Sequence, residues 1–232
     1  SAIVYFPACP SRMFGAPETE YGLLSTPDAM VALLERAGYD VVIPPRLTGQ
    51  CCGQPFQSKG FPEQATEVGG ALNRELSVLS DAGRLPVVTD ASTCAKHLAE
   101  FPGDAAVADS ARFLLGHVLP RLGAVRKLPG VAVHPNCSAQ RLAEQPMTEA
   151  VAAACADRVA VLASVTCCGY AGDKGLFLPE LNAHATRRVG HDIPPGCTLG
   201  VSTVSTCASG LTERAGIPFV GLASLLEWAT RP

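Results

Sequence analysis

Two vicinal cysteine pairs, each followed by glycine, constrain this chain more than any other feature. Each pair has a cysteine before it and a cysteine after it at matching places in both halves of the sequence (Cys9, Cys51, Cys52, Cys94; Cys137, Cys167, Cys168, Cys207). The flanking segments also repeat: IVYFPACPSRM matches VAVHPNCSAQR, TGQCCGQP matches SVTCCGYA, and LPVVTDASTCAKHL matches CTLGVSTVSTCASGL. We therefore predict two homologous modules, residues 1–122 and 131–232.

The cysteine loops follow short apolar, β-branched runs, and stretches with helical spacing separate these runs. Six runs are predicted as strands (3–6, 40–43, 86–89, 131–133, 159–162 and 199–204). Their alternation with helices predicts an α/β fold in which two modules with largely parallel sheets are related by a pseudo-two-fold axis. Helix starts are expected at Thr26, Pro62 and Pro179. Since the carboxyl ends of parallel strands share one edge, the four cysteines of each module should meet there.

Composition excludes several functional classes. The net charge is -3, only 17% of residues are charged, and the chain has no basic run, so nucleic acid is not expected as a partner. Asp157 and Arg158 interrupt the most apolar stretch, 150–165, and neither a transmembrane segment nor a signal peptide is expected. Cysteine-rich chains without an export signal belong to a reducing compartment, so we expect a cytoplasmic protein, or one peripheral at the inner face of the membrane. Ser1 directly precedes a strand-like run, which predicts a piece of a longer polypeptide.

Four converging thiolates are the ligands of an iron–sulfur cluster or of tetrahedral zinc. Neither module has the two C-x₂₋₄-C knuckles typical of zinc, which favours iron–sulfur, and the ferredoxin run C-x₂-C-x₂-C is absent as well. Gly53 and Gly169 would let backbone N–H groups approach the cluster sulfurs. The alternative is that these cysteines are small buried hydrophobes. We prefer that alternative for Cys155, in an Ala-rich helix, and for Cys197, in a Pro-Pro-Gly turn.

Other residues admit two interpretations. Asp173 either stabilises its own turn or lies beside the second cysteine set and tunes it. His134 is expected to be a packed histidine, and Tyr170 could line the crevice. The sequence has no G-x-G-x-x-G and no Walker loop, so the chain itself is expected to lack a nucleotide site.

The twice-repeated order of one cysteine, CCG and a third cysteine anchor resembles the cysteine-rich CCG-domain family. That family includes the cysteine-rich subunit of heterodisulfide reductase, the iron–sulfur subunits of glycolate oxidase and anaerobic glycerol-3-phosphate dehydrogenase, and the C-terminal part of FAD-linked D-lactate dehydrogenases. The segments YFPACPSRMFG, HPNCSAQRL, CCGYAGDKG, FLPELNAHATR and STCASGL are most similar to the last of these. The resemblance covers essentially the whole chain.

This resemblance implies an iron–sulfur electron-transfer domain of an FAD-linked 2-hydroxy-acid oxidoreductase of the D-lactate dehydrogenase or glycolate type. The eight cysteines would be ligands of up to two clusters, expected as [4Fe–4S], and no residue here would be catalytic. FAD would lie on a further domain or a flavoprotein subunit, a quinone or cytochrome would accept the electrons, and the chain alone would be inactive. A heterodisulfide reductase-like thiol–disulfide module and a non-catalytic metal-binding assembly domain remain alternatives.

The chain departs from the fullest family motif, which ends in C-x-x-C. Here Cys94 is followed by Ala-Lys-His and Cys207 by Ala-Ser-Gly. His97 stands in place of the missing thiol and could ligate iron, as imidazole does in Rieske centres. The alternative is a histidine on an amphipathic helix. The departure puts the noncubane clusters and disulfide chemistry of heterodisulfide reductase in doubt.

Overall fold

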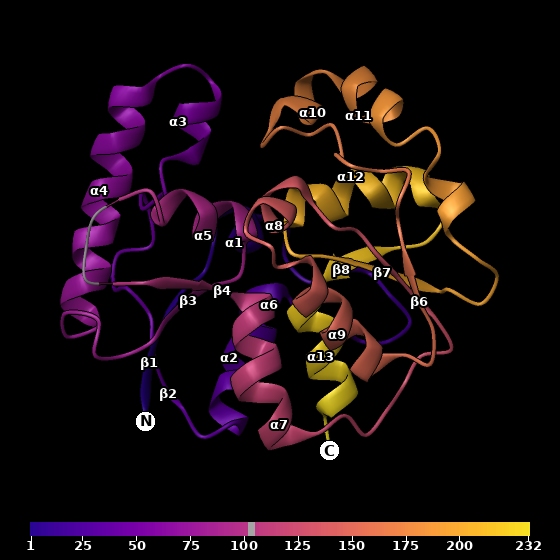
Figure 1. The fold of residues 1–232 in the computed structure, drawn as a ribbon, viewed down its shortest axis with the longest axis horizontal. Helices are drawn as coiled ribbons and strands as arrows, with labels where there is room; N and C mark the ends of the chain where they lie inside the picture. The colour runs from indigo at the N-terminus through magenta and orange to yellow at the C-terminus, as the bar shows by residue number, and fades with distance from the viewer. Residues whose placement is uncertain (102–104) are drawn as a thin grey trace.

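The computed structural model describes residues 1–101 and 105–232, in which two four-stranded parallel sheets lie side by side (Figure 1). The first has the order β2-β1-β3-β4 and the second β6-β5-β7-β8. The strands are β1 Ala2–Phe6, β2 Asp40–Val42, β3 Val87–Thr89, β4 Val107–Asp109, β5 Val131–Val133, β6 Val159–Val161, β7 Leu199–Ser202 and β8 Phe219–Gly221. The shared order confirms the α/β prediction of two like modules. The six predicted strands are present, whereas the three-residue edge strands β4 and β8 were not predicted.

Helices connect the strands of each sheet. In the first half these are α1 Cys9–Phe14, α2 Thr26–Arg36, α3 Gln54–Ser58, α4 Pro62–Leu79, α5 Ser92–Leu98, α6 Ser110–Phe113, the π-helix η1 Leu114–Val118 and α7 Leu119–Leu122. In the second half they are α8 Cys137–Arg141, α9 Gln145–Cys155, α10 Lys174–Phe177, α11 Pro179–Ala185, the 3₁₀ helix η2 Val189–Asp192, α12 Ser205–Ala215 and α13 Leu222–Thr230. The three predicted starts at Thr26, Pro62 and Pro179 coincide with α2, α4 and α11.

Alternate residues along each central strand face two different cores. Ile3 and Tyr5 of β1 point into a core that also contains Val131 and Val133 of β5 and the helices α2, α6, α9 and α13. These helices form one layer between the sheets (Figure 1). The opposite face of β1 packs on α4 and α5, and the opposite face of β5 packs on α12. One apolar core therefore joins the two halves of the chain.

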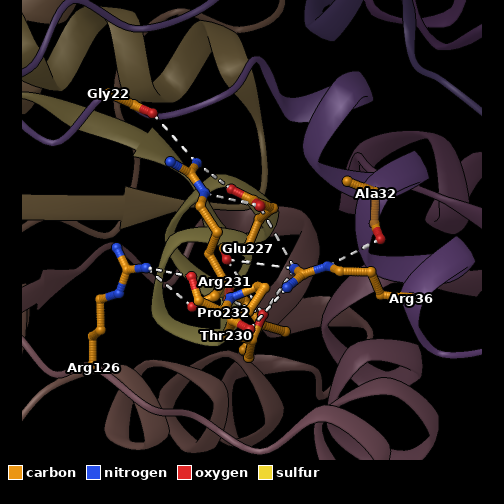
Figure 2. A network of polar contacts seen from close by, with 9 residues as sticks. Gly22, Ala32, Arg36, Arg126, Glu227, Thr230, Arg231 and Pro232 are labelled. Carbon is orange, nitrogen blue, oxygen red and sulfur yellow. Dashed lines mark hydrogen bonds and ion pairs between the residues drawn. The ribbon is translucent and has the colours of Figure 1, made fainter.

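The helix contacts across this junction come in symmetric pairs. α2 packs on α13 as α9 packs on α6, and α1 packs on α12 as α8 packs on α5. Figure 2 shows the polar contacts at the α2–α13 junction, where the buried Glu227 carboxylate lies between Arg36 and Arg231. Arg36 also donates to the Thr230 carbonyl at 2.8 Å. These contacts fit the predicted pseudo-two-fold arrangement. The module borders at 122 and 131 remain a prediction.

Within the described residues, the helices are too short or too polar to cross a bilayer.

Candidate metal centre

The cysteine loops lie where the strand order of each sheet reverses. The chain passes from β1 to the edge strand β2 and then back to β3 on the other side of β1, so a crevice opens beyond the carboxyl ends of β1 and β3. Cys9 follows β1 as the first residue of α1, and Cys94 lies in the first turn of α5, after β3. Cys51 and Cys52 lie between β2 and α3. The second module repeats this placement after β5, β6 and β7.

All eight of these cysteines line a single cavity of about 430 Å³. The sequence predicted that four cysteines meet within each module. In the structure the two groups of four also face each other across one cavity. We name them the first set (Cys9, Cys51, Cys52 and Cys94) and the second set (Cys137, Cys167, Cys168 and Cys207). Packing of α5 on α8 brings the two sets to one cavity, and Thr93 Oγ1 lies 3.3 Å from Ser138 Oγ at this contact.

Within the first set, contacts between neighbouring thiols shift the pKa values of Cys9, Cys51 and Cys52. The adjacent Cys51 thiol and burial raise the pKa of Cys9, while Arg12 opposes that rise. The Cys52 thiol raises the pKa of Cys51. Cys9 and Cys51 are half-buried, and Cys52 and Cys94 are buried.

The second set has the same order of neighbours but is more open. Cys168 Sγ lies 2.8 Å from Cys207 Sγ, well beyond the roughly 2.05 Å of a disulfide bond. Hydrogen bonds from Cys137 and Cys168 lower the pKa of Cys167, whereas the pKa of Cys137 is raised chiefly by its contact with Cys167. Cys137 and Cys167 are exposed to solvent.

The glycine after each cysteine pair is required by the backbone. Gly53 has φ +92° and Gly169 has φ +76°, in the left-handed region that favours glycine. A Cβ at Gly53 would lie 2.4 Å from the Ala65 carbonyl oxygen, and one at Gly169 would lie 2.5 Å from that of Leu181. Each glycine N–H donates to the sulfur two residues before it, Cys51 or Cys167, at 3.4 Å.

A buried polar chain ties the cysteine loops of the two modules together. Asn136 caps α8 by accepting from the Ser138 and Ala139 N–H groups, and its Nδ2 donates to Thr203 Oγ1 at 2.6 Å. The same hydroxyl lies 2.6 Å from Ser92 Oγ at the start of α5. The loops that carry Cys137, Cys207 and Cys94 are thus held by one buried network.

His97 and Asp173 are among the predicted site residues that do not line the cavity. His97 is buried with its ring edge-on to Phe101, and its Nδ1 lies 3.2 Å from a Glu100 carboxylate oxygen. Asp173 pairs with Lys59 at 2.6 Å, which lowers the pKa of the Asp173 carboxyl. The His97 ring lies beside Gly53, where a Cβ would be 3.1 Å from Nε2, and its role as a ligand stays a prediction. Asp173 has its partner in the other module.

The remaining sequence candidates are placed as follows. His134 is buried with Nδ1 3.3 Å from Ser202 Oγ, and burial lowers its pKa to about 4. Tyr170 is buried beside the cavity, and its hydroxyl donates to Glu213. Cys155 packs in the shared core, and Cys197 is buried against Gly130, both away from the cavity.

The sequence interpretation missed three residues that hold the cysteine loops. Asp90 accepts hydrogen bonds from Tyr5 Oη at 2.6 Å and from the Ala8 N–H at 2.9 Å, directly before Cys9. Asn182 donates to the Cys168 carbonyl at 2.8 Å. Arg12 donates to the sulfur of Cys9 at 3.3 Å. The spacing Cys-x-x-Arg within one helix turn was a signal for Arg12, but Asp90 and Asn182 depend on contacts between distant segments.

Residues 3–99 match the cysteine-rich domain family CCG. The chain thus contains a CCG cysteine-rich domain around its first set, and the second set lies outside the matched residues.

Curated relatives extend the similarity. The chain is 31% identical over 162 residues to lactate utilization protein A of Geobacillus thermodenitrificans (strain NG80-2), which covers 62% of this chain and 65% of that protein. A second match, to lactate utilization protein A of Geobacillus kaustophilus (strain HTA426), is 39% identical over 74 residues and covers 32% of this chain and 28% of that protein. The matches therefore span less than two thirds of either relative, and the chain is distantly similar to them.

Among solved structures, the aspartate racemase of Picrophilus torridus aligns with 98% of this chain and 91% of its own, at 13% identity and a TM-score of 0.39. At this score the likeness bears on neither mechanism nor substrate.

Proposed function

We propose that the chain is an iron–sulfur electron-transfer module in which each four-cysteine set holds one cluster, of the [4Fe–4S] type. The observation that carries the proposal is the arrangement of eight thiols, in two equivalent sets of four, around one cavity. Four cysteine ligands are the usual complement of such a cluster. Both sets also have a glycine N–H directed at a cysteine sulfur.

The pKa values of the thiols indicate that each set of four is suited to bind a positively charged cluster of several metal ions. In each set the contact between the first two thiols raises the pKa of one of them, Cys9 or Cys137, so four thiolates can coexist only when positive charge enters between them. Among residues 1–101 and 105–232, no three His, Cys, Asp or Glu side chains are grouped around a position for one metal ion. A cluster with several irons lets each thiolate bind a different iron, whereas zinc would need all four sulfurs at about 2.3 Å from one point.

The family resemblance and the relatives' name, lactate utilization protein A, support a role in 2-hydroxy-acid oxidation. Iron–sulfur clusters supply single-electron transfer, while the two-electron step on a hydroxy acid needs a cofactor such as flavin. We therefore place this chain between an FAD-binding domain or subunit and a quinone or cytochrome acceptor. Its own residues hold the ligand sulfurs in place, keep Cys52, Cys94, Cys168 and Cys207 away from water, and direct N–H groups at the sulfurs.

The experiment is to prepare the protein anaerobically and to mix it with its flavin-containing domain or subunit and D-lactate or glycolate. We expect bleaching of a broad visible absorbance only when flavin and substrate are both present. Substrate-dependent reduction without flavin, or a colourless protein that contains zinc, would contradict the proposal.

A thiol–disulfide reaction is the second candidate, favoured by one observation. The cavity is open to solvent at Cys137 and Cys167, and both sets face it, so a small disulfide could meet either set. Turnover of low-molecular-weight disulfides by the reduced protein, at a rate independent of the flavin partner, would favour this candidate over electron transfer.

A further inference from the structure

Arg12 makes the closest contact between a cation and a ligand sulfur among the hydrogen bonds of the described residues. It lies one turn after Cys9 on α1, and its Nη2 donates to Cys9 Sγ at 3.3 Å. The same guanidinium donates to two backbone carbonyls of the segment before Cys51, that of Leu47 at 2.6 Å and that of Gln50 at 3.2 Å. One side chain thus joins α1 to the loop that carries the cysteine pair.

The second set has no such contact within the described part of the chain. The repeat places Gln140 three residues after Cys137, where the first module has Arg12 three residues after Cys9. Gln140 is exposed and donates to the Pro135 carbonyl, and no hydrogen bond from it to a cysteine sulfur is present in the described residues. The two sets therefore differ by one full charge at a ligand sulfur.

We propose that Arg12 is a positioning residue that fixes Cys9 against the 43–50 loop and raises the reduction potential of the centre held by the first set. This inference rests on the proposed function, because it concerns a group that the four thiols of this set would hold. Electron uptake makes a thiolate-ligated centre more negative, and a cation beside one of its sulfurs stabilises that added charge. Hydrogen bonds to the sulfurs act in the same direction.

Asp90 is the opposing charge in the same module. Its carboxylate is buried and is engaged by Tyr5 Oη and the Ala8 N–H, so its hydrogen bonds are directed at the loop that precedes Cys9. Arg12 touches the sulfur itself. Replacing Arg12 alone leaves Asp90 in place, so the change in potential measures the Arg12 contribution separately.

The test uses the anaerobically loaded chain and a redox titration followed by electron paramagnetic resonance. Arg12→Gln installs the residue that the second module has at this position. We expect it to keep iron in both sets and to lower the potential of one centre, making its one-electron reduction about tenfold less favourable, which is about 59 mV. Arg46→Gln removes a cation from an exposed position on the same loop and should leave both potentials unchanged. Unchanged potentials in Arg12→Gln would overturn the proposal.

Arg12→Lys is the second variant, and it tests the effect of Arg12 on the potential if Arg12→Gln loses iron from the first set. Lysine keeps the charge but cannot donate to the sulfur and two carbonyls as the guanidinium fork does. We expect iron in both sets and a shift of the same centre smaller than tenfold. A potential identical to that of the wild type would overturn the proposal.

Hydrogen exchange separates failure of this inference from failure of the proposed function. If the wild-type chain binds no iron, the proposed function fails. In that metal-free protein, Arg12→Gln should still speed amide exchange in residues 43–50 several-fold, because the Leu47 and Gln50 carbonyls lose their partner. If amide exchange in residues 43–50 is the same in Arg12→Gln and in the wild type, Arg12 does not position this loop either.

Discussion

The two cysteine sets share a topology but differ in exposure. Cys9 and Cys51 of the first set are half-buried, whereas their counterparts Cys137 and Cys167 are exposed. The loop from β2 to the first cysteine pair has eight residues, 43–50, and the loop from β6 to the second pair has five, 162–166. The longer loop also supplies the carbonyls that hold Arg12. Sheet topology thus fixes where the thiols meet, and loop length decides how enclosed they are.

The supports behind the two sets also differ. In the first module the Asp90 carboxylate accepts from the Ala8 N–H, and in the second the side chain of Asn136 donates to Thr203. Both arrangements connect the loop after the first strand of a module to the loop after its third. The same junction is therefore made with a buried charge in one module and with neutral groups in the other.

The largest loss of stability is expected when a side chain is added at the glycine after each cysteine pair. Gly169→Ala and Gly53→Ala each place a Cβ against a backbone carbonyl that cannot move away cheaply. We expect each to destabilise the fold by about 3 kcal/mol or more and to weaken metal retention in its own set. Urea unfolding and iron assays measure both effects.

Gly216→Ala is the matched control for these glycine variants. Gly216 has φ +73° but open space around its Cβ position, so only the backbone strain of about 1 kcal/mol should appear. Equal losses in Gly216→Ala and Gly169→Ala would show that contact with the cysteine loop plays no part.

As the pH falls, Asp90 in the first module and His134 in the second should change the free energy of unfolding in opposite directions. Burial raises the pKa of Asp90 from 3.8 to about 6, so the folded state binds more protons than the unfolded state between about pH 4 and 6. Its contribution to stability therefore increases as pH falls through that window, by about 3 kcal/mol. Burial lowers the pKa of His134 from 6.5 to about 4, so its contribution is lost as pH falls from about 6.5 to 4, by a similar amount.

Urea unfolding of two variants at about pH 7 and about pH 5 checks these signs. Relative to the wild type, Asp90→Asn should lose stability on acidification, and His134→Phe, which installs the Phe6 counterpart, should gain it. Parallel pH profiles for both variants and the wild type would contradict the assigned burial effects.

Thiol modification should distinguish the sets by rate. Cys167 is exposed, and its pKa is lowered by Cys137 and Cys168, whereas Cys9 and Cys51 are half-buried with raised pKa values. Since the thiolate is the reactive form, iodoacetamide should modify Cys167 of the metal-free protein several-fold faster than Cys9 or Cys51. Peptide mass spectrometry gives the rates. Faster modification of Cys9 or Cys51 than of Cys167 would contradict the difference in exposure and pKa between the two sets.

The smallest effect is expected at the ion pair between Lys59 and Asp173. Both side chains are about 40% exposed (43% and 40%), so Asp173→Asn should change the unfolding free energy by less than about 1 kcal/mol. If Asp173 only pairs with Lys59, Lys59→Met should have the same effect and neither variant should move a cluster potential. A potential shift confined to Asp173→Asn would instead support tuning of the second set.

The sequence predicted the features that follow from repetition and from strand topology. The cysteine order, the apolar runs and the rule that parallel strands share an edge were enough to expect the two sheets and the convergence of four thiols in each module. The single shared cavity could not be predicted, because it depends on how α5 packs on α8 and α1 on α12. Local periodicity contains no information about that packing.

Individual side chains show the same limit. His97 lies one helical turn after Cys94, but its spacing could not show that the ring packs edge-on to Phe101 and beside Gly53. Asp173 was considered only with its own turn and the second set, whereas its partner Lys59 lies in the other module. β4 (VAD) and β8 (FVG) each contain a single β-branched residue, too weak a pattern to distinguish them from loop.

Iron and acid-labile sulfide, counted in anaerobically prepared wild type, Cys52→Ser and Cys168→Ser, test most directly whether each set holds its own cluster. Cys197→Ser, outside the cavity, is the control. We predict about half of the wild-type iron and sulfide in each of the two cavity variants and full content in the control, because each set has its own four ligands. Loss of all iron from either single variant would show one shared centre, and a wild type without iron or sulfide would contradict the account.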